Sequence, residues 1–276
     1  MNLKQISYLL LFTVLVTVNA NADHFTMGYE KKSIDHTFDY NVFGASMNEE
    51  QDIDIDLLGL SYGRIFDNYM IEFSLKHDID QSYVMTTADS NSYIADKRSA
   101  GYTELGFRFV KPINSILNSS IGTRYSKFST EREMSVVSIA NPGTVGLMGT
   151  LDYDNSDFLL EAKLDFHHKY KIFSYGLDLG AILQTGNVKS GIKTLQGQYA
   201  LNYNYINVGY SITPNIAVNF TEDTKLKLAY LYSQTQNIMI YNDSFSHSLY
   251  PSVGDLYVKS NDRGEQSLML NLIHNF

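Results

Sequence analysis

The chain has 276 residues, with 21 basic and 30 acidic side chains, a formal net charge of −9 and no cysteine. An acidic chain disfavours nucleic acid as a partner, and a chain without cysteine forms neither disulfides nor thiolate metal sites. No linker, repeat or low-complexity tract divides the sequence, which predicts a single domain.

Residues 1–22 have the layout of a cleaved secretory signal peptide. Lys4 precedes the apolar run 8–18, and the small-residue sequence Ala20-Asn21-Ala22 precedes Asp23. The run is too short to cross a bilayer as a helix, which takes about 20 apolar residues. We therefore expect export through the inner membrane, with residues 23–276 forming the mature domain.

Apolar and polar residues then alternate with a period of two along most of the chain. In the window 69–77, for example, Tyr69, Ile71, Phe73 and Leu75 are separated by polar residues or Met70. The pattern recurs in the windows 58–63, 104–109, 158–166, 173–181, 212–220 and 226–232. It is typical of strands with one face on lipid and the other in a lumen. The predicted fold class is all-β, a transmembrane antiparallel up-and-down β-barrel.

Ten segments are predicted as strands, an even number that places both termini in the periplasm. They are 24–34, 52–66, 69–84, 99–111, 116–130, 156–168, 171–185, 212–220, 225–240 and 265–276. Two more segments, 145–153 and 198–210, leave eight or twelve strands open. Short turns are predicted at 67–68, 111–114, 168–169 and 221–224, and the long polar segments 85–98, 133–155, 187–211 and 242–264 are predicted as extracellular loops.

Aromatic residues gather near the predicted short turns and the end of the chain. They are Phe66, Tyr69, Phe109, Phe166, Tyr170, Phe173, Phe220 and Phe276. Rings of this kind favour the headgroup level of a membrane, which predicts a girdle on the periplasmic side.

The last strand places Leu268, Leu270, Leu272 and Phe276 on one face. It resembles the C-terminal insertion signal of bacterial outer-membrane proteins, although His274 stands where a bulky apolar residue is usual. The resemblance implies an outer-membrane location, insertion by the barrel-assembly machinery, and contact with outer-membrane lipid and lipopolysaccharide.

The opposite face of the strands carries a balanced set of charges. Five acidic and five basic residues point to the predicted lumen: Glu72, Lys76, Glu104, Arg108, Arg124, Glu161, Lys163, Asp165, Asp178 and Lys227. A small barrel is filled by its own side chains, whereas an open pore would carry small polar residues or one sign of charge. The set therefore predicts a narrow, charge-paired lumen, unless the charges serve only to compensate each other structurally.

The sequence His77-Asp78-Ile79-Asp80 is similar to the paired aspartates of the omptin proteases, which are also ten-stranded barrels. The omptin mechanism also needs an Asp/His pair between strands seven and eight. Neither residue occurs between 187 and 211. The resemblance therefore lacks its general base, and we expect Asp78 and Asp80 to form a solvated rim.

Other groups are weaker candidates for a site. Glu49, Glu50, Asp52, Asp54 and Asp56 form an acidic rim without the compact ligand spacing of a calcium or magnesium loop. His167 and His168 point to opposite faces of a strand and cannot share a metal ion. His247 and Ser248 lack an orienting third group for a hydrolase of the lipid A deacylase type. We predict no metal site, cofactor or catalytic residue.

The sequence thus favours a non-enzymatic outer-membrane protein whose surface loops contact an extracellular ligand, a host surface or a phage. A small passive or substrate-specific channel is the first alternative. A membrane-embedded hydrolase, omptin-like or lipid A deacylase-like, is the second.

Overall fold

The computed structural model describes residues 23–42, 45–79, 81–88, 92–138, 145–194, 197–247 and 257–276. They form eleven strands: β1 (His24–Val42), β2 (Ala45–Phe66), β3 (Tyr69–Asp78), β4 (Gln81–Ala88), β5 (Ser92–Asn114), β6 (Leu117–Ser138), β7 (Val145–Tyr170), β8 (Phe173–Thr194), β9 (Gly197–Asn219), β10 (Thr224–His247) and β11 (Tyr257–Asn275). No helix of sufficient length and apolarity to cross a membrane lies within these residues.

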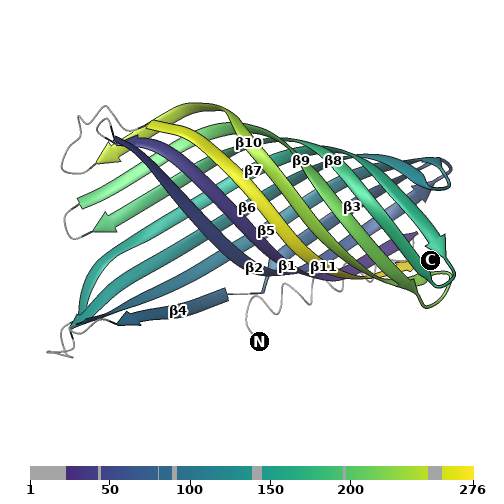
Figure 1. The fold of residues 1–276 in the computed structure, drawn as a ribbon, viewed down its shortest axis with the longest axis horizontal. Coiled ribbons are helices and arrows are strands. Elements are labelled where there is room, and N and C mark those ends of the chain that lie inside the picture. Colours follow the sequence, from purple (N-terminus) through teal and green to yellow (C-terminus); the bar gives the residue numbers. More distant parts are fainter. Residues whose placement is uncertain are drawn as a thin grey trace.

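The strands close into a ten-strand antiparallel barrel (Figure 1). Each neighbour in the order β3-β2-β1-β11-β10-β9-β8-β7-β6-β5-β4 is hydrogen-bonded to the next, and the pairing of β3 with β5 closes the ring. β3 and β4 both run along β5, so together they make one barrel strand interrupted near residue 80. This confirms the predicted fold class and strand number. Segments 145–153 and 198–210 are parts of β7 and β9, not additional barrel strands.

The strands are much longer than predicted, and the four predicted loops are wrong. Most of 85–98, 133–155, 187–211 and 242–264 is strand in the described residues. The hydrogen-bonded pairing of neighbouring strands continues there. β7 and β8, for example, pair without interruption from Gly149 opposite Thr194 to Tyr170 opposite Phe173. Hydropathy alternation marks only strand segments with one face on an apolar medium, so the polar extensions gave no signal.

The short turns all lie at one end of the barrel. A turn at Asp67-Asn68 is confirmed, whereas the next two fall at 115–116 and 171–172, slightly beyond the predicted positions. At 171–172, Lys171 takes a left-handed φ of 54°. The strand-forming residues before these turns remain paired, as in Tyr170 opposite Phe173.

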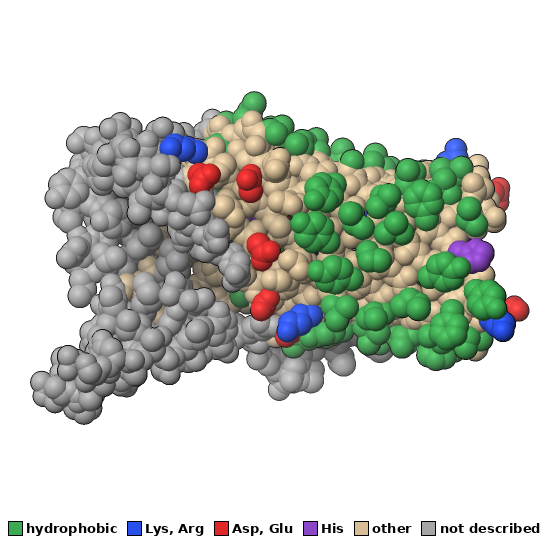
Figure 2. Space-filling model, in the orientation of Figure 1, with side chains coloured by type: hydrophobic (Ala, Val, Ile, Leu, Met, Phe, Trp, Pro, Cys, Tyr) green, Lys and Arg blue, Asp and Glu red, His purple; other side chains and the backbone are tan. Residues whose placement is uncertain are grey.

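A band of exposed apolar side chains surrounds the half of the barrel next to the short turns (Figure 2). On β8 it runs from Phe173 to Leu183, and ten steps of ~3.3 Å at a tilt of ~40° give a height of ~25 Å. We call this band the apolar belt. At its lower edge the ring of Tyr69 stacks on Phe66 and Phe109, with centroids 4.7 and 5.0 Å away. Leu268, Leu270 and Leu272 of β11 also belong to the belt.

Candidate functional site

The interior of the barrel is divided into three layers along its axis. A water-accessible vestibule occupies the end with the short turns, a network of buried charges lies above it, and an apolar cluster fills the level above that. The layers follow from the strand alternation that points every second residue inward. The three are called here the vestibule, the ion network and the inner core.

The vestibule is a cavity of about 710 Å³ whose lining includes His167, Asn219, Glu222 and Asp223 beside the turns. It therefore opens at the turn end of the barrel. Its wall also contains all ten charges that the sequence places in the lumen: Glu72, Lys76, Glu104, Arg108, Arg124, Glu161, Lys163, Asp165, Asp178 and Lys227.

Several of these charges are in direct contact with one another, either across neighbouring strands or within one strand. Arg108 Nη2 lies 2.7 Å from Glu72 Oε2, and Lys163 Nζ lies 2.9 Å from Glu161 Oε2. The Ser211 hydroxyl donates a 2.5 Å hydrogen bond to the Glu161 carboxylate.

Asp165 and Asp178, also in the vestibule, accept hydrogen bonds from neutral side chains. The Ser120 hydroxyl donates to Asp165 at 3.2 Å, and the Asn215 amide donates to Asp178 at 3.3 Å. Lys227 on β10 is attracted by the charge of Asp178 on β8, the next strand but one. The vestibule is thus a polar chamber in which positive and negative groups alternate.

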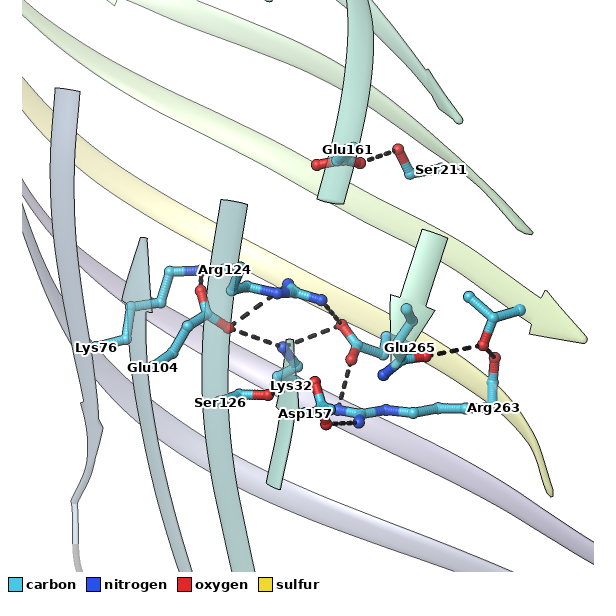
Figure 3. A network of polar contacts seen from close by, with 12 residues as sticks. Lys32, Lys76, Glu104, Arg124, Ser126, Asp157, Glu161, Ser211, Arg263 and Glu265 are labelled. Atoms are coloured by element: carbon cyan, nitrogen blue, oxygen red, sulfur yellow. Dashed lines mark hydrogen bonds and ion pairs between the residues drawn. The ribbon is translucent and has the colours of Figure 1, made fainter. Parts of the chain in front are cut away.

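The ion network consists of four carboxylates and four cations, shown in part in Figure 3. Its members are Glu30, Lys32, Lys76, Glu104, Arg124, Asp157, Arg263 and Glu265. They come from β1, β3, β5, β6, β7 and β11, so the contacts connect strands on different sides of the lumen. Equal numbers of opposite charges allow each buried group to be compensated, as burial requires.

Lys32 and Glu265 are at the centre of the ion network. Lys32 Nζ lies 3.1 Å from Glu265 Oε2 and 3.6 Å from Glu104 Oε2. Arg124 contacts the same two carboxylates, at 3.2 Å from Glu265 and 3.5 Å from Glu104. Lys76 joins Glu104 to Glu30, at 3.0 and 2.7 Å. Two cations therefore bridge the same pair of carboxylates.

Neutral polar residues complete this level on the side of β8, β9 and β10. The Thr235 hydroxyl donates to Gln184 at 3.2 Å, and the Asn207 amide donates to Thr235 at 3.3 Å and to the Asn261 carbonyl at 3.0 Å. These side chains are at most 4% exposed. Each of these hydrogen bonds pairs a buried donor with a buried acceptor.

Sequence reasoning missed five of the eight members of the ion network. Glu30, Lys32 and Asp157 lie within predicted strands. The alternation of inward and outward residues along those strands would have placed them in the lumen. Arg263 falls in a segment predicted as a loop, and Glu265 begins the last predicted strand. Strand alternation could not be applied to Arg263 because its neighbourhood has no apolar face to set the register.

The inner core is built from large apolar and aromatic side chains. Its members are Ile34, Ile55, Leu57, Tyr102, Phe128, Tyr153, Val188, Tyr203, Tyr205 and Val258. Gly186 makes room for one of them, because a Cβ there would lie 2.6 Å from Tyr205 Cζ. Tyr102 links the layers: its hydroxyl donates to Glu104 at 2.5 Å and lies 3.0 Å from Lys32 Nζ.

Every barrel strand contributes at least one buried side chain to the level of the ion network or the inner core. One set that runs around the barrel is Ile34, Leu57, Asp78, Tyr102, Phe128, Tyr153, Val188, Tyr205, Thr235 and Arg263, each no more than 7% exposed. These side chains leave almost no surface to solvent in the described part of the chain. The vestibule lies on the turn side of this level.

His36 lies beside the inner core and outside the apolar belt, since Tyr29 is the last exposed apolar residue among the β1 side chains that the structure describes. Its ring meets Tyr153 edge-on at 5.9 Å. Burial, together with the nearby positive charge of Arg263, lowers the pKa of His36 to about 3. The imidazole is therefore neutral at physiological pH.

Asp78, the first of the two omptin-like aspartates, is not part of the expected solvated rim. Asp78 is 7% exposed and faces the interior, because β3 carries it below the break between β3 and β4. The neighbouring His77 Nδ1 lies 2.9 Å from the Thr103 hydroxyl and 3.5 Å from Asp78 Oδ1. Asp80 lies outside the described residues.

The other candidate groups remain separate from one another. His168 packs against Tyr175 at 5.3 Å, and both His167 and His168 border the vestibule. His247 ends β10, and Ser248 and the predicted signal peptide 1–22 lie outside the described residues. No group of three or more residues that could hold a metal ion occurs in the described ranges.

The predicted acidic rim lies on β2, above the apolar belt. Asp54 is exposed there, and Asp56 accepts a 2.6 Å hydrogen bond from the Tyr29 hydroxyl. The side chains of Glu49, Glu50 and Asp52 are outside the described part, although their backbone belongs to β2.

Comparison with solved structures identifies the type of barrel. The outer-membrane protease OmpT of Escherichia coli superposes with a TM-score of 0.69 at 10% sequence identity, covering 92% of this chain and 97% of OmpT. The chain has the fold of bacterial outer-membrane β-barrel proteins.

Weaker likenesses, each with a TM-score of 0.39, are to the outer-membrane protein OprG of Pseudomonas aeruginosa and to the translocator domain of the autotransporter NalP of Neisseria meningitidis. OprG is 11% identical, with 93% of this chain and 97% of OprG covered, and NalP is 8% identical, with 99% and 97% covered. No protein-family model and no curated protein sequence matches the chain.

Proposed function

We propose that this protein is a non-enzymatic integral protein of the outer membrane with an occluded lumen. In this proposal the part of the barrel that extends beyond the apolar belt recognises an extracellular ligand, a host surface or a phage. A rigid scaffold that presents exposed polar segments is a common basis of recognition.

The observation that carries the proposal is the occlusion of the lumen by two successive layers. A conducting pore needs a continuous polar path. Here the ion network and the inner core both cross the interior, and their side chains contact one another from opposite walls, as Arg263 of β11 contacts Asp157 of β7. An ion crossing this level would have to displace side chains from both layers.

The apolar belt supports a membrane location. Exposed Phe, Tyr, Leu and Ile side chains surround the barrel over a height of ~25 Å, which matches the hydrocarbon band of outer-membrane barrels. We propose that outer-membrane lipid and lipopolysaccharide contact this belt. Export by the signal peptide 1–22 and insertion by the barrel-assembly machinery belong to the same proposal.

The geometry gives less support to a protease, although OmpT shares the fold. Asp78 is buried in the interior rather than open to a substrate. Neither Asp nor His occurs between 187 and 211, where an omptin-like general base would lie. We therefore favour a protein without catalytic residues.

The second candidate function is a small passive or substrate-specific channel. The vestibule of about 710 Å³ favours it, because half of a path across the membrane is already open to water. A channel would require a second conformation in which the side chains of the ion network and of the inner core move apart.

Conductance in planar lipid bilayers tests the proposal against the channel. The purified, refolded protein should insert without discrete current steps at either polarity, while a known porin in the same bilayers supplies the positive control. Reproducible single-channel steps that depend on this protein would overturn the occluded barrel and support the channel.

A further inference from the structure

The barrel wall is open along one seam above the apolar belt. β2 pairs with β3 only from Leu57 to Phe66, and β4 pairs only with β5 among the described strands. Among the described residues, the hydrogen bond from the Ile79 amide to the Asp56 carbonyl, 2.9 Å long, is the last backbone link on that side of β2. We call the unpaired stretch between residues 45–55 of β2 and β4 the open seam; Figure 1 shows β4 diverging from β2.

A bulge between β3 and β4 accounts for the open seam. His77 pairs with Thr103, and Gln81 pairs with Ala100, so three residues of this barrel strand lie opposite two of β5. A bulge bends its strand and ends pairing on one side. β4 therefore follows β5 away from β2.

The edge of β2 directs unpaired backbone groups into the open seam. The main-chain groups of successive residues in a strand point alternately to its two sides. Because the Asp56 carbonyl faces the seam, and β2 pairs with β1 without a register shift, the main chain of Asp54, Asp52 and Glu50 faces it as well. Such an edge is a template for another strand.

The two edges of the open seam differ in charge. Residues 45–56 of β2 contain Glu49, Glu50, Asp52, Asp54 and Asp56, whereas residues 81–88 of β4 contain no charged side chain. The adjacent strand β1 places Asp35 opposite Asp52. The acidic edge repels a second copy of itself and attracts a positively charged chain.

We propose that the edge of β2 in the open seam binds an extended, cationic segment of a partner protein by strand addition. Main-chain hydrogen bonds would supply affinity, and the acidic residues of β2 would select positive charge. The proposal rests on the proposed recognition function and specifies its surface and the chemistry of the partner.

Three synthetic peptides of equal length test the proposal on the full chain folded in detergent micelles. The first repeats Lys-Val four times, the second repeats Lys-Pro four times, and the third repeats Glu-Val four times. Proline removes donors and prevents strand pairing without changing the charge. By fluorescence anisotropy the Lys-Val peptide should bind at least tenfold more tightly than either other peptide. Equal binding of the Lys-Pro peptide, or no binding of the Lys-Val peptide, would overturn strand addition.

Two substitutions at Asp54 separate the backbone contribution from the charge. Asp54→Pro removes an amide that faces the open seam and not β1, so the barrel should still fold, as heat-modifiable electrophoretic mobility would report. Asp54→Asn removes the same charge and keeps the amide. Lys-Val binding should fall at least tenfold in Asp54→Pro and no more than about threefold in Asp54→Asn. Equal binding by the two variants would contradict the proposal.

Disulfide trapping gives a second measurement that does not depend on Asp54→Pro folding. The chain has no cysteine, so Asp54→Cys and Gln236→Cys each introduce a single thiol above the apolar belt, the second on β10 far from the seam. A Lys-Val peptide with one cysteine should crosslink to Asp54→Cys alone. Equal crosslinking at both positions would overturn the assignment of the site.

The outcomes also distinguish this proposal from the proposed function. A protein that shows no current steps and binds no Lys-Val peptide would overturn strand addition and leave the occluded barrel standing. A protein that conducts would overturn the occluded barrel, whatever the peptide result.

Discussion

Arg263 and Asp157 are 106 residues apart in the chain, yet Arg263 Nη1 lies 2.5 Å from Asp157 Oδ2. The two strands that carry them, β11 and β7, are not neighbours in the barrel wall. Both side chains are at most 3% exposed. The pair therefore spans the lumen and connects opposite walls.

Removing one member of this pair should destabilise the barrel strongly. Arg263→Met leaves the Asp157 carboxylate buried without its cation, which costs about 3–5 kcal/mol for buried pairs of this kind. Asp157→Leu should cost a similar amount, and the double variant should recover a large part of the loss. Reversible urea unfolding in lipid vesicles measures the three free energies.

The exposed hydrogen bond between Tyr29 and Asp56 is the control for the Arg263–Asp157 cycle. Tyr29→Phe should lower the unfolding free energy by no more than about 1 kcal/mol. A loss as small as this in both Arg263→Met and Asp157→Leu would contradict a structural role for the ion network.

Thiol reactivity should locate the boundary between the vestibule and the sealed layers. Ser174 lines the vestibule, whereas Ser126, which donates a 2.8 Å hydrogen bond to Asp157, is fully buried. In the cysteine-free chain, Ser174→Cys should react with a water-soluble maleimide in the folded state. Ser126→Cys should react only after denaturation, and its rapid modification in the folded protein would show that the lumen admits solvent.

The neutral His36 should make the barrel less stable in acid. Its native pKa of about 3 lies below the unfolded value of about 6.5, so below pH 6.5 the unfolded chain takes up a proton that the folded chain does not. The unfolding free energy should therefore fall between pH 6.5 and pH 4, by about 3 kcal/mol from this group alone.

His36→Gln is the matched variant, because glutamine does not titrate. The difference in unfolding free energy between the two proteins should shrink or change sign as the pH falls from 7 to 4. Parallel curves over this range would show that His36 is protonated in the folded barrel or does not contribute.

The apolar belt should tolerate charge only outside its limits. Leu179 lies near the middle of the belt on β8 and is 39% exposed. Leu179→Arg should cost about 2–4 kcal/mol of unfolding free energy in lipid. Gln236→Arg, at an exposed position beyond the belt, should cost less than about 0.5 kcal/mol. Similar costs at the two sites would place the bilayer elsewhere on the barrel.

The fold was largely predictable because a bilayer imposes a simple rule on each strand. Leu177 and Leu179 alternate with Gly176 and Asp178, and this period of two identified β8 and its register. Beyond the belt the rule no longer applies, because both faces of a strand contact water or polar side chains. Residues 187–194 were accordingly predicted as part of a loop, although they continue β8.

The sequence predicts which individual residues point into the lumen, but it does not predict which of them contact one another. Position parity places Glu104 and Arg124 in the lumen, but it does not show that Arg124 contacts both Glu104 and Glu265, the latter 141 residues further along the chain. Which charges meet depends on barrel closure and strand stagger. The burial of Asp78 likewise depends on the bulge near residue 80, for which the sequence carries no clear signal.

Lys32, Glu104 and Glu265 belong to strands near the start, the middle and the end of the chain. Until β1 joins β11, these three groups have no common location and each must stay hydrated. The charges in the lumen therefore pair with one another only in the last step of assembly, when β1 joins β11. We expect a chain with either terminal strand removed to form an open sheet whose charged face stays hydrated, and not a smaller barrel.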